Sequence, residues 1–497
     1  TTIISPVFRK REKEIAAYSR CGCDMQYSQL RWLLSKSYDT QIGNQYKFSS
    51  IRDYAAFSKQ VPVHSYETLF PYIQKMIEGK KNILWPGQTV WFAKSSGTTN
   101  DRSKYIPVTR ESLRQCHYAG GRDCISLYLQ NNRKSHFFSG KGVVLGGSLR
   151  KSEISDKALV GDLSAVMIKN IPEWANFLRT PAKKIMLMDD WTAKMEAISN
   201  SVVHENVTSL SGVPSWFLAL IKYILNKNRK TTLTEIWPNL EVFFHGGIGF
   251  EPYIGQYKAL IPSPNMHYME TYNASEGFFG IQNDLSDKTL LLMLDYGIFY
   301  EFLPMENLES PEPQLLPLEG VETGKHYAMV ITTNSGLWRY MIGDTICFTE
   351  KNPWKFLITG RTKQFINAFG EELMVHNAEV ALTKACQETN SIIKDYTVAP
   401  VYMTSKDVGH HQWIIEFEKQ PDSLFHFTEI LDTTLKTINS DYDAKRYNNM
   451  TLKEPEIIIA RKDLFYQWLE NKNKLGGQFK VPRLCNDRKY IEELLQM

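Results

Sequence analysis

Apolar residues recur at helical spacing along the N-terminal part of the chain, from Arg9 to about Gly79. Tyr27, Leu30 and Leu34, for example, fall on one face of a helix with 3.6 residues per turn. This periodicity predicts a helical N-terminal region. The region contains no obvious catalytic or ligand-binding pattern.

Short apolar runs alternate with helical stretches in the next part of the chain. The candidate strands cover residues 89–93, 142–147, 207–212, 240–244 and 266–272. A helix is predicted to begin at Pro214, because proline is favoured at the first helical position. Strands that alternate with helices predict an α/β domain with a largely parallel sheet. Ligands bind such sheets beyond the carboxyl ends of the strands, so the loops there are the candidate functional segments.

The pattern changes to β-hairpins between residues 289 and 350, with predicted turns at 295–297 and 334–336. A strand over residues 353–361 then leads into a smaller α+β region. Its predicted elements are helices near 379–388 and 427–438, strands near 398–402 and 413–418, and a glycine-rich loop at 476–477.

These elements predict an α/β fold in two domains. The large domain is expected to combine mostly parallel sheets with β-hairpins, and the C-terminal domain is expected to be a small, mobile α+β unit. We place the large domain at residues 1–357, a hinge at 358–364 and the small lid domain at 365–497.

Composition and charge exclude several classes of protein. The 497 residues are 43% hydrophobic and carry a formal net charge of +4, with no long run of like charges, which argues against a dedicated nucleic-acid binder. The most apolar window, residues 290–303, is interrupted by Asp295 and Glu301 and is too short to cross a bilayer. The seven cysteines are scattered and indicate neither a disulfide framework nor a metal site. The N-terminus has no signal-peptide pattern, so we expect a cytoplasmic protein without a membrane or nucleic-acid partner.

Hydroxyl groups, a glycine and two cations are concentrated in residues 95–104, directly after a predicted strand. Hydroxyls, backbone N–H groups and cations are the groups that bind phosphate oxygens. The segment is not a Walker loop, because Lys104 follows Ser103 and precedes Tyr105. Taken alone, a loop of this composition is most often an ordinary connection between two elements.

Two further segments combine a tyrosine with a carboxylate at a predicted strand end. Residues 272–276 contain an aromatic ring for stacking on a base, a hydroxyl, and Glu276, whose oxygens suit Mg2+. In residues 338–344, Asp344 follows Gly343 and is placed to accept hydrogen bonds from ribose hydroxyls. The structural alternative for residues 272–276 is a surface turn. For residues 338–344 it is an ordinary turn in which the side chain of Asp344 caps its own backbone.

Taken together and in this order, the three segments resemble the core motifs of adenylate-forming enzymes, which include acyl-CoA synthetases, nonribosomal peptide synthetase adenylation domains and luciferase. More closely, the chain is similar to the acyl acid amido synthetases of the auxin-responsive Gretchen Hagen family. The matching segments are residues 95–107, 272–276 and 340–344, and residues 212–216, 359–363 and 478–483 also look like family segments. One departure is Asn100-Asp101, where the family loop often has glycine.

The resemblance implies an ATP- and Mg2+-dependent ligase, with a small-molecule carboxylic acid and an amine such as an amino acid as substrates. It implies that phosphates are bound by Ser95, Ser96, Gly97, Thr98 and Thr99, with Lys104 nearby for charge. The rest of the nucleotide is expected to contact Tyr272, which would stack on adenine, together with Asn273, Ala274, Ser275, Asp344 and Arg361, and Glu276 would hold Mg2+. Two lysines compete for the role of the lysine that many adenylating enzymes bring from the small domain: Lys363 and Lys480.

The acid pocket is expected between the helix start after residue 212, the strand end at 244–248 and the helix after the phosphate loop. The candidate pocket residues are Arg122, Val213, Trp216, His245, Gly246 and Gly247. The alternative interpretations are structural: Arg122 could be an ordinary surface arginine, and His245 could be an ordinary core histidine. Two other functions remain open from the sequence: a ligase that uses coenzyme A or a carrier-protein thiol, and a nucleotide-binding switch without turnover.

Overall fold

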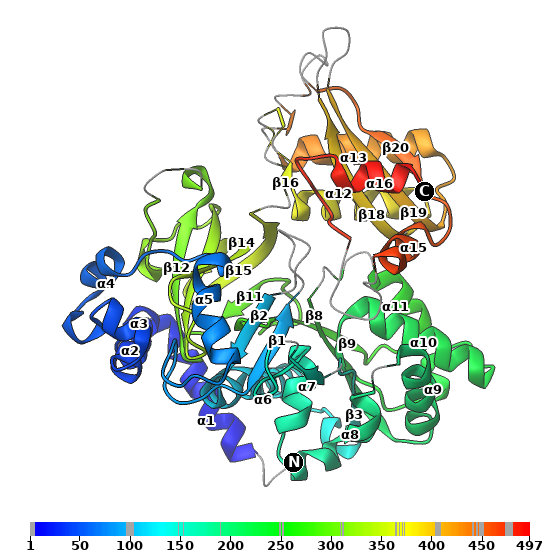
Figure 1. Ribbon diagram of the computed structural model, residues 1–497. Coiled ribbons are helices and arrows are strands. Elements are labelled where there is room, and N and C mark those ends of the chain that lie inside the picture. Colours follow the sequence, from blue (N-terminus) through cyan, green and yellow to red (C-terminus); the bar gives the residue numbers. More distant parts are fainter. Residues whose placement is uncertain are drawn as a thin grey trace. The chain divides into compact units, whose positions relative to one another are not determined.

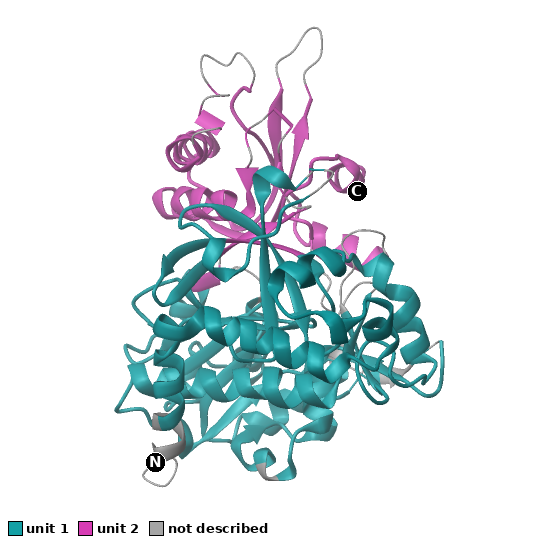
Figure 2. Cartoon of the chain, turned by 90° about the vertical axis from the view of Figure 1, so that its left-hand side faces the viewer, with its two compact units in different colours: residues 1–248, 255–342, 347–357 teal, residues 249–254, 343–346, 358–497 magenta. Residues whose placement is uncertain are grey.

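The computed structural model describes residues 5–95, 104–147, 149–152, 154–188, 190–247, 250, 253–308, 310, 313–362, 365–366, 368–369, 371, 373–402, 409–439, 442–443, 446, 452–472 and 481–497. The chain divides into two compact units (Figure 2). Unit 1 contains residues 1–248, 255–342 and 347–357, and unit 2 contains residues 249–254, 343–346 and 358–497.

The N-terminal part of unit 1 is helical, as its periodicity predicts (Figure 1). It forms α1 (Ser5–Ala16), α2 (Tyr18–Ser37), α3 (Gln41–Gln45), α4 (Tyr54–Gln60) and α5 (Tyr66–Ile77). The helices α3, α4 and α5 begin where Thr40, Asp53 and Ser65 accept a hydrogen bond from the backbone N–H three residues later. Such caps satisfy backbone donors that the first turn leaves without an intrahelical partner.

A four-stranded sheet follows, in the order β2-β1-β5-β4. Its strands are β1 (Trp91–Ser95), β2 (Lys104–Val108), β4 (Leu149–Lys151) and β5 (Leu159–Gly161). β1 runs parallel to β5 and antiparallel to β2, with Ser95 opposite Lys104. The predicted phosphate loop therefore starts and ends at this residue pair.

The large sheet is parallel on one side only. Its order is β12-β13-β14-β15-β11-β10-β9-β8-β7-β3-β6. The run from β9 (His267–Ala274) through β8 (Val242–Gly246), β7 (Val207–Gly212) and β3 (Lys141–Val144) to β6 (Arg179–Thr180) is parallel. Beyond β9, the pairs β9/β10, β10/β11, β11/β15 and β12/β13 are antiparallel. The ranges of these strands are β10 (Gly277–Ile281), β11 (Leu290–Leu292), β12 (Ile298–Pro304), β13 (His326–Thr333), β14 (Tyr340–Lys351) and β15 (Trp354–Arg361).

The predicted hairpin at residues 295–297 is wrong, although a bend is present there. The flanking strands β11 and β12 are not neighbours, because β11 pairs with β10 and β15 while β12 pairs with β13. Gln26 of α2 explains the difference. Its amide nitrogen donates to the carbonyls of Leu294 and Ile298 at 2.9 and 3.0 Å, and its oxygen accepts from Tyr300 N at 2.9 Å. A helix side chain thus satisfies backbone groups that strand pairing would otherwise satisfy.

Further helices of unit 1 connect the strands. They include the π-helical turn η2 (Ser112–His117), α6 (Tyr118–Asn131), α7 (Leu163–Asn170), α8 (Lys183–Met186), α9 (Trp191–Val202), α10 (Pro214–Asn228) and α11 (Ile254–Leu260). The helix α10 begins at Pro214 as predicted, and the hydroxyl of Tyr257 donates to Pro214 O at 2.7 Å. That bond anchors the start of α10 to α11.

Unit 2 is an α+β unit, as the C-terminal pattern predicts. Its sheet has the order β18-β19-β20, and a separate short pair joins β16 (Phe365–Ile366) to β17 (Leu373–Met374). The sheet strands are β18 (Ile392–Val401), β19 (His410–Lys419) and β20 (Glu456–Ile459), and the helices are α12 (Val375–Glu388), α13 (Leu424–Ile438), α15 (Leu464–Asn471) and α16 (Lys489–Leu495). Trp413 and Phe427 are among the fully buried residues of its main core.

Two further sequence expectations concern membranes and cysteines. Among the described residues, none of the helices has both the length and the apolar character needed to span a bilayer. All seven cysteines are free thiols.

Candidate nucleotide and acid site

The carboxyl ends of the parallel strands bring several predicted site residues to one edge of the large sheet. Gly212 at the end of β7 lies opposite His245 of β8, and Gly246 lies opposite Thr271 of β9. Thr271 Oγ1 donates to His245 O at 3.1 Å. Because Val213 directly follows Gly212, these strand ends occupy the position at which such sheets bind ligands.

Glycine is required at the end of β8. A Cβ atom on Gly246 would lie 2.3 Å from the carbonyl oxygen of Thr271, which is backbone and cannot move aside. Gly247 has φ +84°, a left-handed conformation that favours glycine. The predicted pair Gly246-Gly247 is thus explained by close backbone approach followed by a sharp change of direction.

His245 is 3% exposed, and burial lowers its pKa to about 3. Its ring packs against Phe243, with centroids 5.5 Å apart. The imidazole is therefore neutral at physiological pH. Its role in an acid pocket stays a prediction, as does that of the partly buried Trp216.

The described contacts of Arg122 are not with these strand ends. Its half-exposed side chain binds Asp123, with Nε 2.9 Å from Oδ1. Asp123 is fully buried and also accepts from Arg11 of α1 and from the hydroxyl of Tyr296, both at 2.7 Å. The described structure thus associates Arg122 with α1, and its predicted contact with the substrate stays untested.

The second motif forms the turn between β9 and β10, where Ala274 lies opposite Gly277. Ser275 and Glu276 occupy the turn and are buried, at 6% and 7% exposure. The hydroxyl of Ser275 is buried and has no hydrogen-bond partner among the described residues. Buried hydroxyls almost always have a partner, and a ligand bound at this turn would supply one.

Residues before this turn are held by η2 and by the core. Asn273 Oδ1 lies 3.3 Å from Nδ1 of His117, whose pKa is lowered to about 4 by burial. The ring of Tyr272 is buried against Phe279 and Phe356, at centroid distances of 4.9 and 6.2 Å. Stacking of Tyr272 on adenine stays a prediction.

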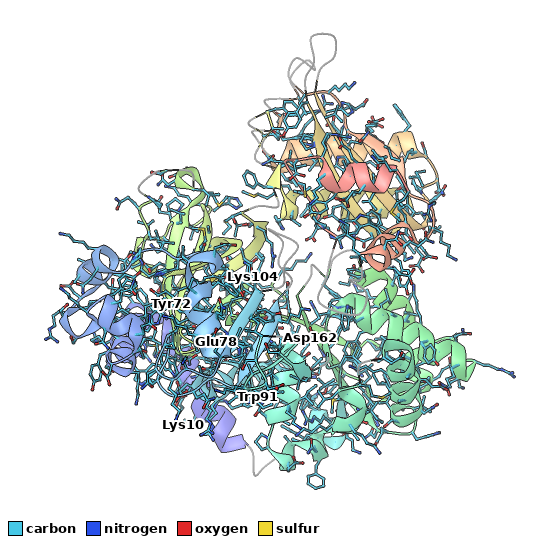
Figure 3. All side chains as sticks on the ribbon, in the orientation of Figure 1. Lys10, Tyr72, Glu78, Trp91, Lys104 and Asp162 are labelled. Atoms are coloured by element: carbon cyan, nitrogen blue, oxygen red, sulfur yellow. The ribbon has the colours of Figure 1, made fainter. Side chains whose placement is uncertain are left out.

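The first and third motifs meet at Lys104, which is labelled in Figure 3. Lys104 Nζ donates to the hydroxyl of Tyr340 at 3.4 Å. The ammonium group also lies 5.7 Å from the ring centroid of Tyr66 and 5.9 Å from that of Tyr340. Tyr66 belongs to the N-terminal helical region, in which the sequence indicates no chemistry. Its position after the cap residue Ser65 is the only sequence feature that marks it.

The strand that carries Tyr340 is also held by the N-terminal region. His64 forms a parallel bridge with Tyr340: His64 N donates to Arg339 O at 2.8 Å, and Met341 N donates to His64 O at 3.0 Å. Arg339 is itself buried and donates to both carboxylate oxygens of Glu301 at 2.8–3.2 Å. These contacts join residues far apart in sequence, so no local pattern could have predicted them.

The predicted ribose-binding residues are in contact within unit 2. Arg361 Nε lies 3.0 Å from Asp344 Oδ1. Gly343, with φ +92°, turns the chain before Asp344, and its carbonyl accepts from Thr362 N at 2.8 Å. The structure thus brings Asp344 and Arg361 together as an ion pair.

Several predicted residues lie outside the described part of the chain: Ser96, Gly97, Thr98, Thr99, Lys363 and Lys480. Ser95 ends β1 and lies opposite Lys104. The roles of all these residues stay predictions.

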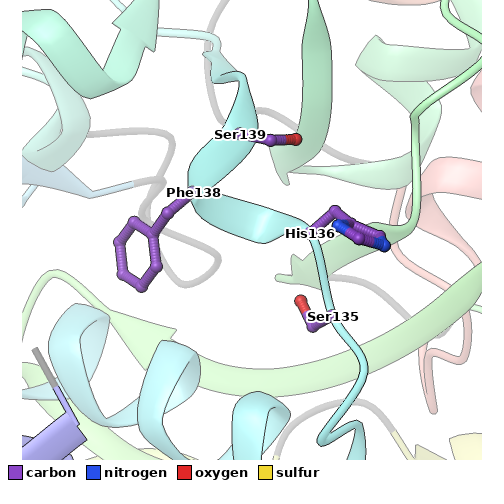
Figure 4. Close-up of a pocket in the computed structure, with 4 residues that line it drawn as sticks. All are labelled: Ser135, His136, Phe138 and Ser139. Carbon is purple, nitrogen blue, oxygen red and sulfur yellow. The ribbon is translucent and has the colours of Figure 1, made fainter. Parts of the chain in front are cut away.

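A pocket of about 170 Å3 lies elsewhere, lined by Ser135, His136, Phe138 and Ser139 (Figure 4). These residues precede β3, and His136 N donates at 3.0 Å to Glu241, which directly precedes β8. The pocket therefore lies at the amino ends of the parallel strands, at the edge opposite the predicted site.

The fold is shared with solved ligases. The 2-hydroxyisobutyryl-CoA ligase in its postadenylation state superposes with a TM-score of 0.60 at 12% identity, over 98% of this chain and 92% of that one. The acyl acid amido synthetase GH3.15 superposes with a TM-score of 0.79 at 20% identity, over 98% and 95% of the two chains.

Sequence profiles then identify the family. The GH3 family N-terminal domain matches residues 11–266, the central domain 291–361 and the C-terminal domain 376–489. The chain belongs to the GH3 family.

Named relatives match almost from end to end. The indole-3-acetic acid-amido synthetase GH3.3 of Arabidopsis thaliana is 24% identical, over 95% of this chain and 90% of its own. The jasmonoyl-L-amino acid synthetase JAR4 of Nicotiana attenuata is 22% identical, over 95% and 92% of the two chains.

Proposed function

We propose that this protein is an acyl acid amido synthetase. It activates a small carboxylic acid with ATP and transfers the acyl group to an amine such as an amino acid. The observation that carries the proposal is the extent of the similarity to amido synthetases, which spans 95% of this chain and includes the C-terminal domain.

The first half-reaction forms an acyl-adenylate. A carboxylate oxygen of the acid attacks the α-phosphorus of ATP, the bond to the bridging oxygen of the β-phosphate breaks, and pyrophosphate leaves. Negative charge on phosphate oxygens is best stabilised by donors that are already in place before the reaction. Lys104, held at the base of the phosphate loop, supplies such a positive charge. Asp344 and Arg361 orient the ribose.

The second half-reaction forms the amide. The amine nitrogen attacks the acyl carbon, the bond from that carbon to the AMP oxygen breaks, and the amine loses a proton to solvent. We propose that unit 2 acts as a lid that changes position between the two steps about residues 358–364. Lys363 or Lys480 is the lysine that unit 2 contributes to adenylation.

Magnesium fits the donors at the β9–β10 turn. Mg2+ usually takes one or two carboxylates and completes its coordination with water and phosphate oxygens. Glu276 supplies one carboxylate, and the Ser275 hydroxyl beside it, which has no partner among the described residues, supplies a further polar group. The described residues contain no cluster of three or more His, Cys, Asp or Glu for a metal held by protein alone. The ion would neutralise phosphate charge when bound.

Acid-dependent exchange of pyrophosphate into ATP tests the proposal. We expect exchange with at least one acid from a broad pool, and a loss of about 100-fold or more in Glu276→Ala. Splitting the pool then identifies the acid. Absence of exchange in a protein that binds ATP would favour a nucleotide-binding switch without turnover.

The acceptor is tested separately, since the fold is shared with a coenzyme A ligase. Preformed acyl-adenylate complex is divided and mixed with pooled amino acids or with coenzyme A. We expect AMP release and an amide product with an amino acid. A thioester product instead would make the protein an acyl-CoA ligase.

A further inference from the structure

Lys104 lies between two aromatic rings from distant parts of the chain. Tyr66 begins α5 and Tyr340 begins β14, and their ring centroids lie 5.7 and 5.9 Å from the ammonium nitrogen. Tyr340 is fully buried, and its hydroxyl accepts from Nζ at 3.4 Å. We call Tyr66 and Tyr340 the aromatic clamp.

Tyr66 also contacts the backbone beside Lys104. Its hydroxyl accepts from Tyr105 N at 2.8 Å. Tyr105 is the second residue of β2 and lies opposite Lys94 in β1. The side chain of Tyr66 therefore contacts both the backbone of β2 and the ammonium group of Lys104, the first residue of that strand.

An aromatic clamp suits a lysine that must act on phosphates. The ring of Tyr66 attracts the cation by its quadrupole and adds no negative charge, while Tyr340 contributes a neutral hydroxyl as the acceptor. A carboxylate in the same place would neutralise the ammonium group and compete with phosphate oxygens. Tyr66 is neutral at physiological pH, as an ordinary tyrosine is, and burial raises its pKa further, to about 12. The clamp thus restricts the lysine without adding a negative charge of its own.

We propose that Tyr66 is a positioning residue for nucleotide phosphates: with Tyr340 it holds the ammonium group of Lys104 in a fixed orientation at the base of the phosphate loop. This inference rests on the proposed function, which requires an ATP site here. It assigns a nucleotide role to the N-terminal helical region through a residue outside the three nucleotide motifs.

Tyr66→Leu and Tyr66→Phe separate the two contacts that Tyr66 makes. The leucine variant loses both the ring face and the hydroxyl, whereas the phenylalanine variant keeps the ring face over Lys104. The matched control is Tyr72→Leu on the same helix, where Lys75 Nζ lies 5.9 Å from the Tyr72 ring centroid (Figure 3). That control shows how much the affinity for ATP changes when a similar cation–ring contact is removed from another position on α5.

The probes are ATP and adenosine, with binding measured by calorimetry. We expect Tyr66→Leu to weaken ATP binding about tenfold, the range of a partly desolvated cation–π contact, and to leave adenosine binding unchanged. Tyr66→Phe should recover most of the ATP affinity, and Tyr72→Leu should match the wild type. Equal ATP affinity in Tyr66→Leu and wild type, or equal losses for ATP and adenosine, would overturn the proposal.

Kinetics distinguish failure of the clamp from failure of the proposed function. In pyrophosphate exchange, Tyr66→Leu should raise the KM for ATP about tenfold and leave the KM for the acid unchanged. If the wild type binds ATP but catalyses no exchange, the proposed function fails while the binding comparison still decides whether the clamp acts. An increase in the KM for the acid alone would contradict the clamp.

Discussion

Arg361 and Asp344 form an ion pair between neighbouring strands β15 and β14, with 3.0 Å between Nε and Oδ1. The Asp344 side chain is 10% exposed and that of Arg361 is 39% exposed. The guanidinium thus helps to orient the carboxylate, so a substitution of Arg361 also affects Asp344.

This pairing predicts how the protein distinguishes ribose from deoxyribose. Asp344→Asn should lower kcat/KM for ATP about 10- to 100-fold, the effect of losing a hydrogen bond to a charged group. The measurement is the ratio of kcat/KM for ATP to that for 2′-deoxy- and 3′-deoxy-ATP in pyrophosphate exchange. In Asp344→Asn, this ratio should fall toward one for the deoxynucleotide that lacks the hydroxyl bound by Asp344. Arg361→Ala should lower the same ratio, but by less. Unchanged ratios in both variants would exclude a ribose-binding role.

The proposed hinge predicts unequal effects on the two half-reactions. Thr362→Pro removes the N–H that donates to Gly343 O at 2.8 Å and restricts the residue before it. Amide formation should fall at least about tenfold more than pyrophosphate exchange, because only the complete reaction requires the lid to move. Thr362→Val is the control, since it keeps the N–H and loses only the hydroxyl contact to Gly343 O. Retention of both half-reactions in the proline variant would show that residues 358–364 are not the hinge.

Buried His245 predicts a loss of stability in acid. Its pKa is lowered from 6.5 to about 3 in the folded chain, so below pH 6.5 the unfolded chain binds a proton that the folded chain does not. The free energy of unfolding therefore falls as pH falls from 6.5 toward 3, by about 1.4 kcal/mol per unit.

The difference between wild type and His245→Gln isolates this effect in urea titrations. Between pH 7 and pH 5, the variant should lose about 2 kcal/mol less stability than the wild type. Replacement of the exposed His204 by Gln should leave the pH dependence unchanged. Identical slopes for His245→Gln and wild type would mean that burial of His245 does not resist protonation.

Elements whose signal is local could be predicted from the sequence. The strand over 207–212 and the helix from Pro214 occur as predicted, because hydrophobic period and the fixed φ of proline act within a few residues. The expected hairpin at 295–297 is wrong because Gln26, about 270 residues earlier in the chain, binds the backbone there.

The same distinction applies to the candidate site. Asp344 and Arg361 could be proposed because they belong to short motifs, and the structure brings them into contact, while their binding of ribose stays a prediction. Tyr66 could not, because its role depends on a 5.7 Å approach to Lys104 that only the tertiary fold creates. Neither the identity of the acid nor that of the amine is encoded in any local pattern.

Gly120 and Gly121 are adjacent in α6, but their surroundings differ completely. A Cβ atom on Gly120 would lie 2.3–2.7 Å from three ring atoms of Phe278, whereas one on Gly121 would meet nothing within 4 Å. Phe278 lies in β10 opposite Asn273, directly after the turn that carries Glu276. A shift of its ring therefore reaches the proposed magnesium and nucleotide site.

Gly121→Ala should raise the free energy of unfolding by about 0.5–1 kcal/mol, since alanine favours a helix over glycine. Gly120→Ala should instead lower it by about 1–3 kcal/mol through overpacking. The second variant should also lower pyrophosphate exchange at temperatures where it remains folded, because the β9–β10 turn is displaced, while Gly121→Ala should retain wild-type exchange. Urea titration and exchange assays on both proteins measure these effects. Equal stability and activity in the two variants would mean that contact between α6 and Phe278 does not position the turn.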